Sequence, residues 1–212
     1  MDAPNATPAA SQAIERTFER AMGAAGRALA EMSGHAMRVV MTEVARTTAP
    51  RIVDAAGGAG TIVVAVYLGI TGSVDGHALL VLQPGDARRL ASLLLDGFAA
   101  PRVLELDELG APALDELELS ALREVGNVTI GAFLNEVGRH LDEPVVVTVP
   151  VAVSDMAGAI LDGVLADLSA DTDDVLAART SFINGGDTIE GAVLVLPRQA
   201  SLAALTVALG AA

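Results

Sequence analysis

The feature that most constrains the fold of this chain is an internal repeat. When the sequence is slid against itself by 105 positions without gaps, identical residues coincide. The coinciding pairs are Gly26 with Gly131, Glu31 with Glu136, His35 with His140, Val40 with Val145, and Val44 with Val149. Residues 74–76 match residues 189–191 at a shift of 115, so the second half carries about ten extra residues. Because neither half is large enough to bury a good core alone, the two are predicted to share one sheet system with pseudo-two-fold symmetry.

Helix and strand patterns follow the same order in both halves of a single domain spanning residues 1–212. Apolar residues at three- and four-residue spacing predict two long helices, at about 11–32 and 114–141. Strands are predicted at 38–44, 61–68, 76–82, 145–149, 175–182 and 191–196, and shorter helices at 86–95, 156–168 and 201–209. The predicted fold is α/β (α+β), with a first half at about 11–100 and a second at about 114–210, joined by an acidic linker around 105–118. The halves share a mixed sheet, and the two long helices lie side by side on its outside.

The charge balance argues against binding to nucleic acid or to a membrane surface. The chain has 27 acidic and 13 basic side chains, all of the latter arginine, for a net charge of −14, and 2% of its residues are aromatic. Such a surface repels phosphate backbones and anionic headgroups, and few rings remain to stack on bases. The longest apolar stretch, 61–70, is about half the length of a membrane span. The N-terminus lacks the pattern of a signal peptide, which predicts a cytoplasmic protein.

Several kinds of catalytic site are excluded by residue type or order. The three histidines are scattered, and His35 and His140 fall at equivalent helix ends, where histidine commonly interacts with the helix C-terminus. The glycine-rich stretch 57–60 leads into a strand, whereas a phosphate cradle needs a helix after the loop and a lysine. The chain has no cysteine, and no serine stands in a G-x-S-x-G setting. The sequence therefore predicts no cofactor or metal of the chain's own.

A polar stripe on the second long helix is the remaining candidate. Ser120, Glu124, Asn127 and Gly131 stand at i, i+4, i+7 and i+11, which places them on one helical face. Asparagine is a poor helix former, and a mid-helix glycine costs about 1 kcal/mol relative to alanine. An ordinary solvated stripe is the alternative, but Asn127 between Gly126 and Gly131 favours a helix shaped for a close approach.

These residues resemble a known signature. Ser120, Glu124 and Asn127, followed after 22 intervening residues by Pro150, are similar to the S/D-x3-E-x2-N-x22-P signature of the CheC-type chemotaxis phosphatases (CheC, CheX and FliY), CheC in particular. The resemblance continues through residues 66–76 and 155–162 and covers nearly the whole chain.

The resemblance implies a role in chemotaxis, a two-component signalling system, by hydrolysis of the aspartyl phosphate of the response regulator CheY. It implies that Asn127 orients the attacking water and that Glu124 pairs with a lysine of CheY, with Ser120 and Pro150 in support. Phosphoryl transfer needs mainly an in-line water and compensation of charge, which an amide and a docking carboxylate can supply. The Mg²⁺ of such a complex is expected on CheY, and the chain is expected to be a monomer or weak oligomer.

The 105-residue shift shows which residues of the first half stand at the positions of the signature. Ser120, Glu124, Asn127 and Pro150 fall on Glu15, Glu19, Met22 and Ala45. This copy keeps its glutamate and loses its asparagine, which predicts one working site and one degenerate site. In this register, Met22→Asn would restore part of a second site if Glu19 points outward.

Two alternatives to a phosphatase remain open. One is a non-enzymatic adaptor of the same fold, similar to the flagellar switch proteins, that binds CheY or the deamidase CheD without turnover. The other is a chemotaxis scaffold whose main partner is CheD and which acts as a phosphatase only when bound. The intact Asn127 favours the enzyme, because an adaptor has no need of it.

Overall fold

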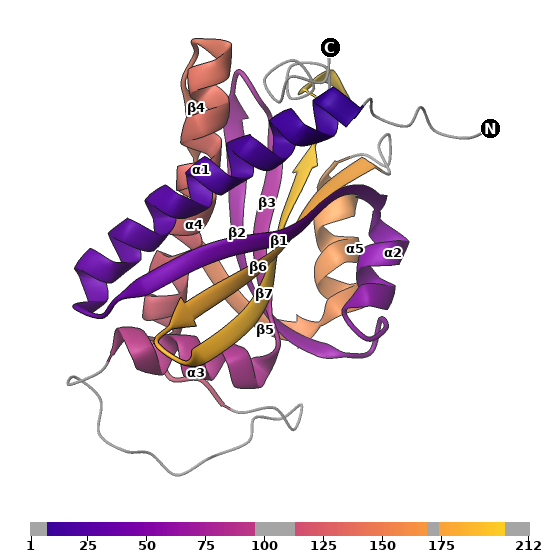
Figure 1. Cartoon of the computed structure of the whole chain (residues 1–212). Helices are drawn as coiled ribbons and strands as arrows, with labels where there is room; N and C mark the ends of the chain where they lie inside the picture. The colour runs from indigo at the N-terminus through magenta and orange to yellow at the C-terminus, as the bar shows by residue number, and fades with distance from the viewer. Residues whose placement is uncertain (1–7, 96–112, 169–173, 202–212) are drawn as a thin grey trace.

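The computed structural model describes residues 8–95, 113–168 and 174–201 (Figure 1). Five helices and seven strands lie in these ranges. They are α1 (Pro8–Ser33), β1 (Met37–Thr48), α2 (Ala49–Ala55), β2 (Ile62–Gly72), β3 (Gly76–Leu82), α3 (Pro84–Leu94), α4 (Glu116–Leu141), β4 (Val145–Val147), β5 (Val151–Met156), α5 (Ala157–Asp167), β6 (Asp174–Asn184) and β7 (Asp187–Pro197). None of the helices in the described ranges is long and apolar enough to cross a membrane.

The sheet carries the symmetry that the repeat predicts. Its strand order is β1-β6-β7-β3-β2-β4, and β5 also pairs with β2. Under the repeat, β1 corresponds to β4 and β5, β2 to β6, and β3 to β7. Replacing each strand by its counterpart in the other half gives the same strand order in the reverse direction. At the centre, Leu79 of β3 pairs with Leu194 of β7, which lies 115 positions later in the chain. The pseudo-two-fold axis therefore passes between β3 and β7.

Helices cover both faces of this sheet. Because side chains alternate along a strand, Val64, Val66 and Leu68 of β2 face one way and Ala65 faces the other. The first set packs in a core with α1, α3 and α4, and Ala65 packs in a second core with α2 and α5. Figure 1 shows α2 and α5 next to each other, away from α4. The two long helices α1 and α4 lie on the same face of the sheet and contact one another, so the predicted arrangement of these helices is confirmed.

The structure differs from the sequence expectations at several elements. Every strand pairing among the described residues is antiparallel, whereas a mixed sheet was expected. The expected strand at 145–149 stops at Val147, and a further strand, β5, precedes α5. The seven-residue helix α2 was not predicted, because it is too short to display a helical period. Most of the predicted acidic linker and nearly all of the helix at 201–209 lie outside the described residues.

Candidate functional site

Local sequence signals fix both ends of α4, the helix that carries the polar stripe. Asp115 is the N-cap: its Oδ1 accepts a hydrogen bond from the Glu118 backbone N–H at 2.7 Å, and Glu118 Oε2 accepts one from the Asp115 N–H at 2.9 Å. This reciprocal capping box satisfies two backbone donors that the first turn would otherwise leave unpaired. The helix ends at Asp142, whose φ of 52° is left-handed.

Packing against β2 sets the rotation of α4. Gly126 is buried, and a Cβ built on it would lie 2.5 Å from Val66 Cγ1 and 2.8 Å from Val66 Cβ. Only a glycine allows the helix to approach the strand this closely, so at Gly126 the close approach is to the sheet. Gly131 differs, because a Cβ there would have no atom within 4 Å. The helix thus seats Gly126 on the sheet and leaves Gly131 open.

The predicted stripe lies on the surface of α4. Ser120 and Glu124 are exposed, Asn127 and Gly131 are half-buried, and Asn135, one turn after Gly131, is exposed. None of the side chains of Ser120, Glu124, Asn127 and Asn135 makes a hydrogen bond or ion pair within the described ranges. Their polar groups therefore remain available to water or to another molecule.

Glu124 differs from the other three glutamates of α4. Glu116 pairs with Arg123, and the buried Glu118 lies 3.6 Å from Arg88 Nε. The buried Glu136 accepts from Arg139 and lies 2.9 Å from Arg20 Nε of α1. In the part of the chain that the structure describes, Glu124 alone among these glutamates has no arginine partner. Its negative charge is uncompensated locally and faces solvent.

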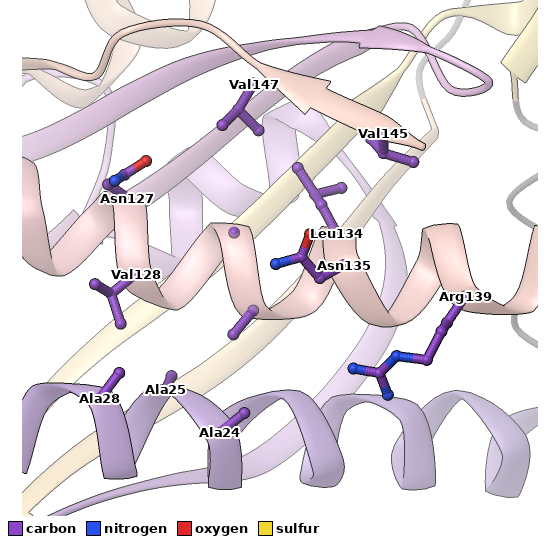
Figure 2. A pocket seen from close by; sticks show the side chains of 12 residues that line it. Ala24, Ala25, Ala28, Asn127, Val128, Leu134, Asn135, Arg139, Val145 and Val147 are labelled. Atoms are coloured by element: carbon purple, nitrogen blue, oxygen red, sulfur yellow. The ribbon is translucent and has the colours of Figure 1, made fainter. Parts of the chain in front are cut away.

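A groove of about 420 Å³ adjoins the stripe, between α4, α1 and β4. From α4 it is lined by Asn127, Val128, Gly131, Ala132, Leu134, Asn135 and Arg139, from α1 by Ala24, Ala25 and Ala28, and from β4 by Val145 and Val147. Figure 2 shows Asn127 rising from α4 on the side of β4, whereas Val128 points toward α1. The two free amides of the stripe, Asn127 and Asn135, therefore border one groove.

Pro150 lies where the edge of the sheet is interrupted. The Thr148 hydroxyl accepts a hydrogen bond from the Gly69 N–H at 2.8 Å, replacing a backbone carbonyl of the ladder. After this irregularity Val149 is 83% exposed, and Pro150 separates β4 from β5. Helix α4 contacts both strands. The proline that resembles the end of the signature thus belongs to the strand segment beside α4.

The first half does not reproduce the stripe. Glu19 is exposed, as expected, but Met22 is buried at 1% exposure, and the side chain of Glu15 lies outside the described residues. The two long helices begin 108 residues apart, and their left-handed terminators Gly34 and Asp142 are also 108 apart. At this shift Met22 corresponds to the buried Ile130, and Glu19 corresponds to Asn127.

This comparison corrects the expectation for Met22. A shift of 105 residues aligns identical residue types in the two halves, whereas a shift of 108 residues aligns the buried positions of the two long helices. Met22 is therefore a core residue and not a solvent-facing position that has lost its amide. A restored second site at position 22 is no longer expected.

The perturbed titratable groups lie on β2 and β3, away from the stripe. His77 Nδ1 shares a 2.7 Å hydrogen bond with the Tyr67 hydroxyl, and His77 Nε2 lies 2.8 Å from Asp167 Oδ2. Burial lowers the pKa of His77, with the Asp167 carboxylate opposing, and burial raises the pKa of Tyr67. His140, by contrast, bonds the Glu136 carbonyl through Nδ1 at 2.8 Å, which is the helix-end role expected for it. Among the described residues no three acidic, histidine or cysteine side chains gather as a metal site would require.

Among the proteins of similar sequence are two CheY-P phosphatases. The chain is 26% identical over 162 residues to the CheY-P phosphatase CheC of Bacillus subtilis, covering 76% of this chain and 74% of CheC. It is 32% identical over 90 residues to the CheY-P phosphatase CheX of Thermotoga maritima, covering 41% of this chain and 48% of CheX. The chain matches no protein-family model.

Solved structures share the fold over nearly the whole chain. FliY of Thermotoga maritima superposes with a TM-score of 0.73 at 17% identity, covering 97% of this chain and 98% of FliY. FliM in a FliG–FliM complex from H. pylori gives 0.64 at 7% identity, covering 94% and 98%. A CheX–CheY–BeF3–Mg²⁺ complex from Borrelia burgdorferi gives 0.50 at 18% identity, covering 86% and 98%. The sequence similarities to CheC and CheX, together with the fold shared with FliY and CheX, support the CheC/CheX/FliY family for this chain.

Proposed function

We propose that this protein hydrolyses the aspartyl phosphate of a CheY-type response regulator. The observation that carries the proposal is a pair of side chains on α4 that have no partner among the residues the structure describes. They are the Glu124 carboxylate and, one turn later, the Asn127 amide. The relatives CheC and CheX are CheY-P phosphatases, which supports the same activity here.

The chemistry asks little of the chain beyond placement of one water. The water oxygen attacks phosphorus in line, the bond between phosphorus and the aspartyl oxygen breaks, and the aspartate leaves as a carboxylate while inorganic phosphate carries away the proton. The Asn127 carbonyl oxygen accepts a hydrogen bond from the water, which aims a lone pair at phosphorus without the amide changing protonation. The Mg²⁺ that compensates phosphoryl charge is supplied by the regulator.

Glu124 acts before the chemical step. An exposed carboxylate without a local cation can receive an ammonium group from the regulator, and this contact fixes the register of the regulator on α4. The chain carries a net charge of −14, so it repels a phosphorylated, acidic partner surface overall. Docking therefore needs a local attraction, which the contact between Glu124 and a cation of the partner provides. We place this reaction in the cytoplasm, with CheD as a further candidate partner.

A second candidate function is a protein-binding adaptor without turnover. It is favoured by FliM, which has the same fold and is found in complexes with FliG and with SpeE. In such an adaptor Glu124 would still dock a partner, and the Asn127 amide would have no effect on phosphate release.

Phosphate release from a phosphorylated CheY, with and without this protein, tests the proposal. The wild type should accelerate release, and Glu124→Ala should weaken both binding and turnover. Asp162→Ala is the matched control, because Asp162 is an exposed carboxylate on α5, on the opposite face of the sheet. An unchanged rate of release with the wild type, together with measurable binding, would support the adaptor instead.

A further inference from the structure

We propose that the groove beyond Asn127 receives an uncharged backbone segment of the same phosphorylated regulator, and that Asn135 hydrogen-bonds this segment. The inference rests on the proposed function, because it takes the docked regulator as the occupant. It adds a second contact on α4 that the signature does not contain.

The first support is the opening at Gly131. This glycine lies midway between Asn127 and Asn135, and an added Cβ there would meet no atom within 4 Å. Gly126 is required by the packing of α4 on β2, but nothing inside the described structure requires a glycine at 131. A mid-helix glycine costs about 1 kcal/mol relative to alanine. Because no contact within the described structure accounts for this cost at Gly131, we look for its explanation in contact with another molecule. Close approach of another backbone is the physical use of a position without a side chain.

The second support is the direction and freedom of the two amides. At 1.5 Å per residue Asn135 lies about 12 Å along the helix from Asn127, and the two directions differ by about 80°. Both side chains border the groove and neither is engaged elsewhere in the described ranges. An amide presents one acceptor and two donors, which matches the carbonyl and N–H of a peptide group.

The charges around the groove define the occupant. Apart from Arg139, the α4 lining is amide, glycine and apolar side chains, and the α1 lining is alanine; Glu124 lies outside the lining, one turn before Asn127. An ionised side chain would lose hydration there without gaining a free counter-charge, because Arg139 already pairs with Glu136, whereas a peptide group can be satisfied by Asn135. The free carboxylate at the near end selects a cation, which links this segment to the regulator's lysine at Glu124. An uncharged loop that follows the docking contact fits these conditions.

An ion pair joins the two helices that line the groove. Arg20 of α1 lies 2.9 Å from the buried carboxylate of Glu136 on α4, and Arg139 also donates to that carboxylate. This ion pair links α1 to α4, and alanines of α1 line the groove between the two helices. The groove is built before the partner arrives.

The test fills the groove without disturbing the fold. Gly131→Leu places a side chain in the open space, and Gly163→Leu is the matched control, because Gly163 lies on α5 and also has no atom within 4 Å of an added Cβ. Binding is measured against CheY carrying beryllofluoride, and turnover against phosphorylated CheY. Gly131→Leu should weaken binding about tenfold or more and raise KM more than it lowers kcat, as expected for a blocked contact inside an interface. Asn135→Ala should weaken binding about two- to tenfold, the usual effect of one lost hydrogen bond.

The outcomes separate this inference from the proposed function. If the wild type binds CheY and Gly131→Leu binds as tightly as Gly163→Leu, the groove is not part of the interface and the inference is wrong. If the wild type binds without hydrolysis, the binding comparison still decides the inference while the phosphatase proposal fails. If the wild type neither binds nor hydrolyses, both are overturned.

Discussion

Replacing Gly126 by alanine should lower the stability of the fold, although alanine is the better helix former. The added Cβ would lie 2.5 Å from Val66 Cγ1, far inside contact distance, and Val66 is fully buried. Valine is stiff about χ1, so it cannot turn away, and either α4 or β2 must move. Overpacking of this kind costs about 1–3 kcal/mol, against a gain of about 1 kcal/mol from helix propensity. The net expectation is a loss of up to about 2 kcal/mol in the free energy of unfolding.

Urea denaturation followed by circular dichroism measures this change, with Gly163→Ala as control. The control faces open space and should gain up to about 1 kcal/mol. Val66→Ala removes Cγ1 and Cγ2, which include the nearest atom that Gly126→Ala would meet, and leaves only the Val66 Cβ contact at 2.8 Å. The double variant should therefore be more stable than the sum of the single effects by about 1 kcal/mol. Stabilisation by Gly126→Ala equal to the control, with strict additivity, would show that close packing of α4 on β2 is not what this glycine serves.

The remaining predictions concern buried groups. Thr129 is buried and its hydroxyl has no hydrogen-bond partner within the described ranges, so Thr129→Val should raise the free energy of unfolding by about 1 kcal/mol in urea melts; a loss would reveal a hidden partner. Met22→Asn should lower it by about 2 kcal/mol or more without adding phosphatase activity, and a doubled rate of phosphate release would reinstate a site in the first half. The pKa of His77 is lowered in the folded chain, so as the pH falls the unfolded chain binds the proton at a higher pH than the folded chain does. The contribution of His77 to stability is therefore complete above about pH 6.5 and declines as the pH falls below it. His77→Gln should flatten that part of the plot of stability against pH, and an unchanged plot would contradict the lowered pKa.

The sequence repeat predicted much of the fold because two halves with the same element order have few ways to share a sheet. The pairing of Leu79 with Leu194 across the axis follows directly from the repeat. The register of the long helices was wrong by three residues, because matching glycines and glutamates align residue types and not buried faces. Strand β5 was missed because its residues do not alternate between buried and exposed positions, the pattern that identifies a strand.

For the candidate site, helical spacing alone placed Glu124, Asn127 and Gly131 on one helical face, where Glu124 is exposed and the other two are half-buried. What the sequence could not predict is which carboxylates gain an arginine from another helix: Arg88 of α3 for Glu118, and Arg20 of α1 for Glu136. The distinct roles of Gly126 and Gly131 were equally hidden, since one faces β2 and the other faces a groove. Such facts depend on how helices are stacked, which local periodicity does not encode.

The most direct test of the central claim is the effect of Asn127→Ala on phosphate release from phosphorylated CheY, measured at saturating protein together with binding to beryllofluoride-treated CheY. An amide that orients the attacking water contributes mainly in the transition state, so kcat should fall about 100-fold or more while binding changes little. Since Asn127 is half-buried without a hydrogen-bond partner in the described structure, its removal should leave the fold intact. Full activity of Asn127→Ala would contradict the assignment of this residue as the one that positions water.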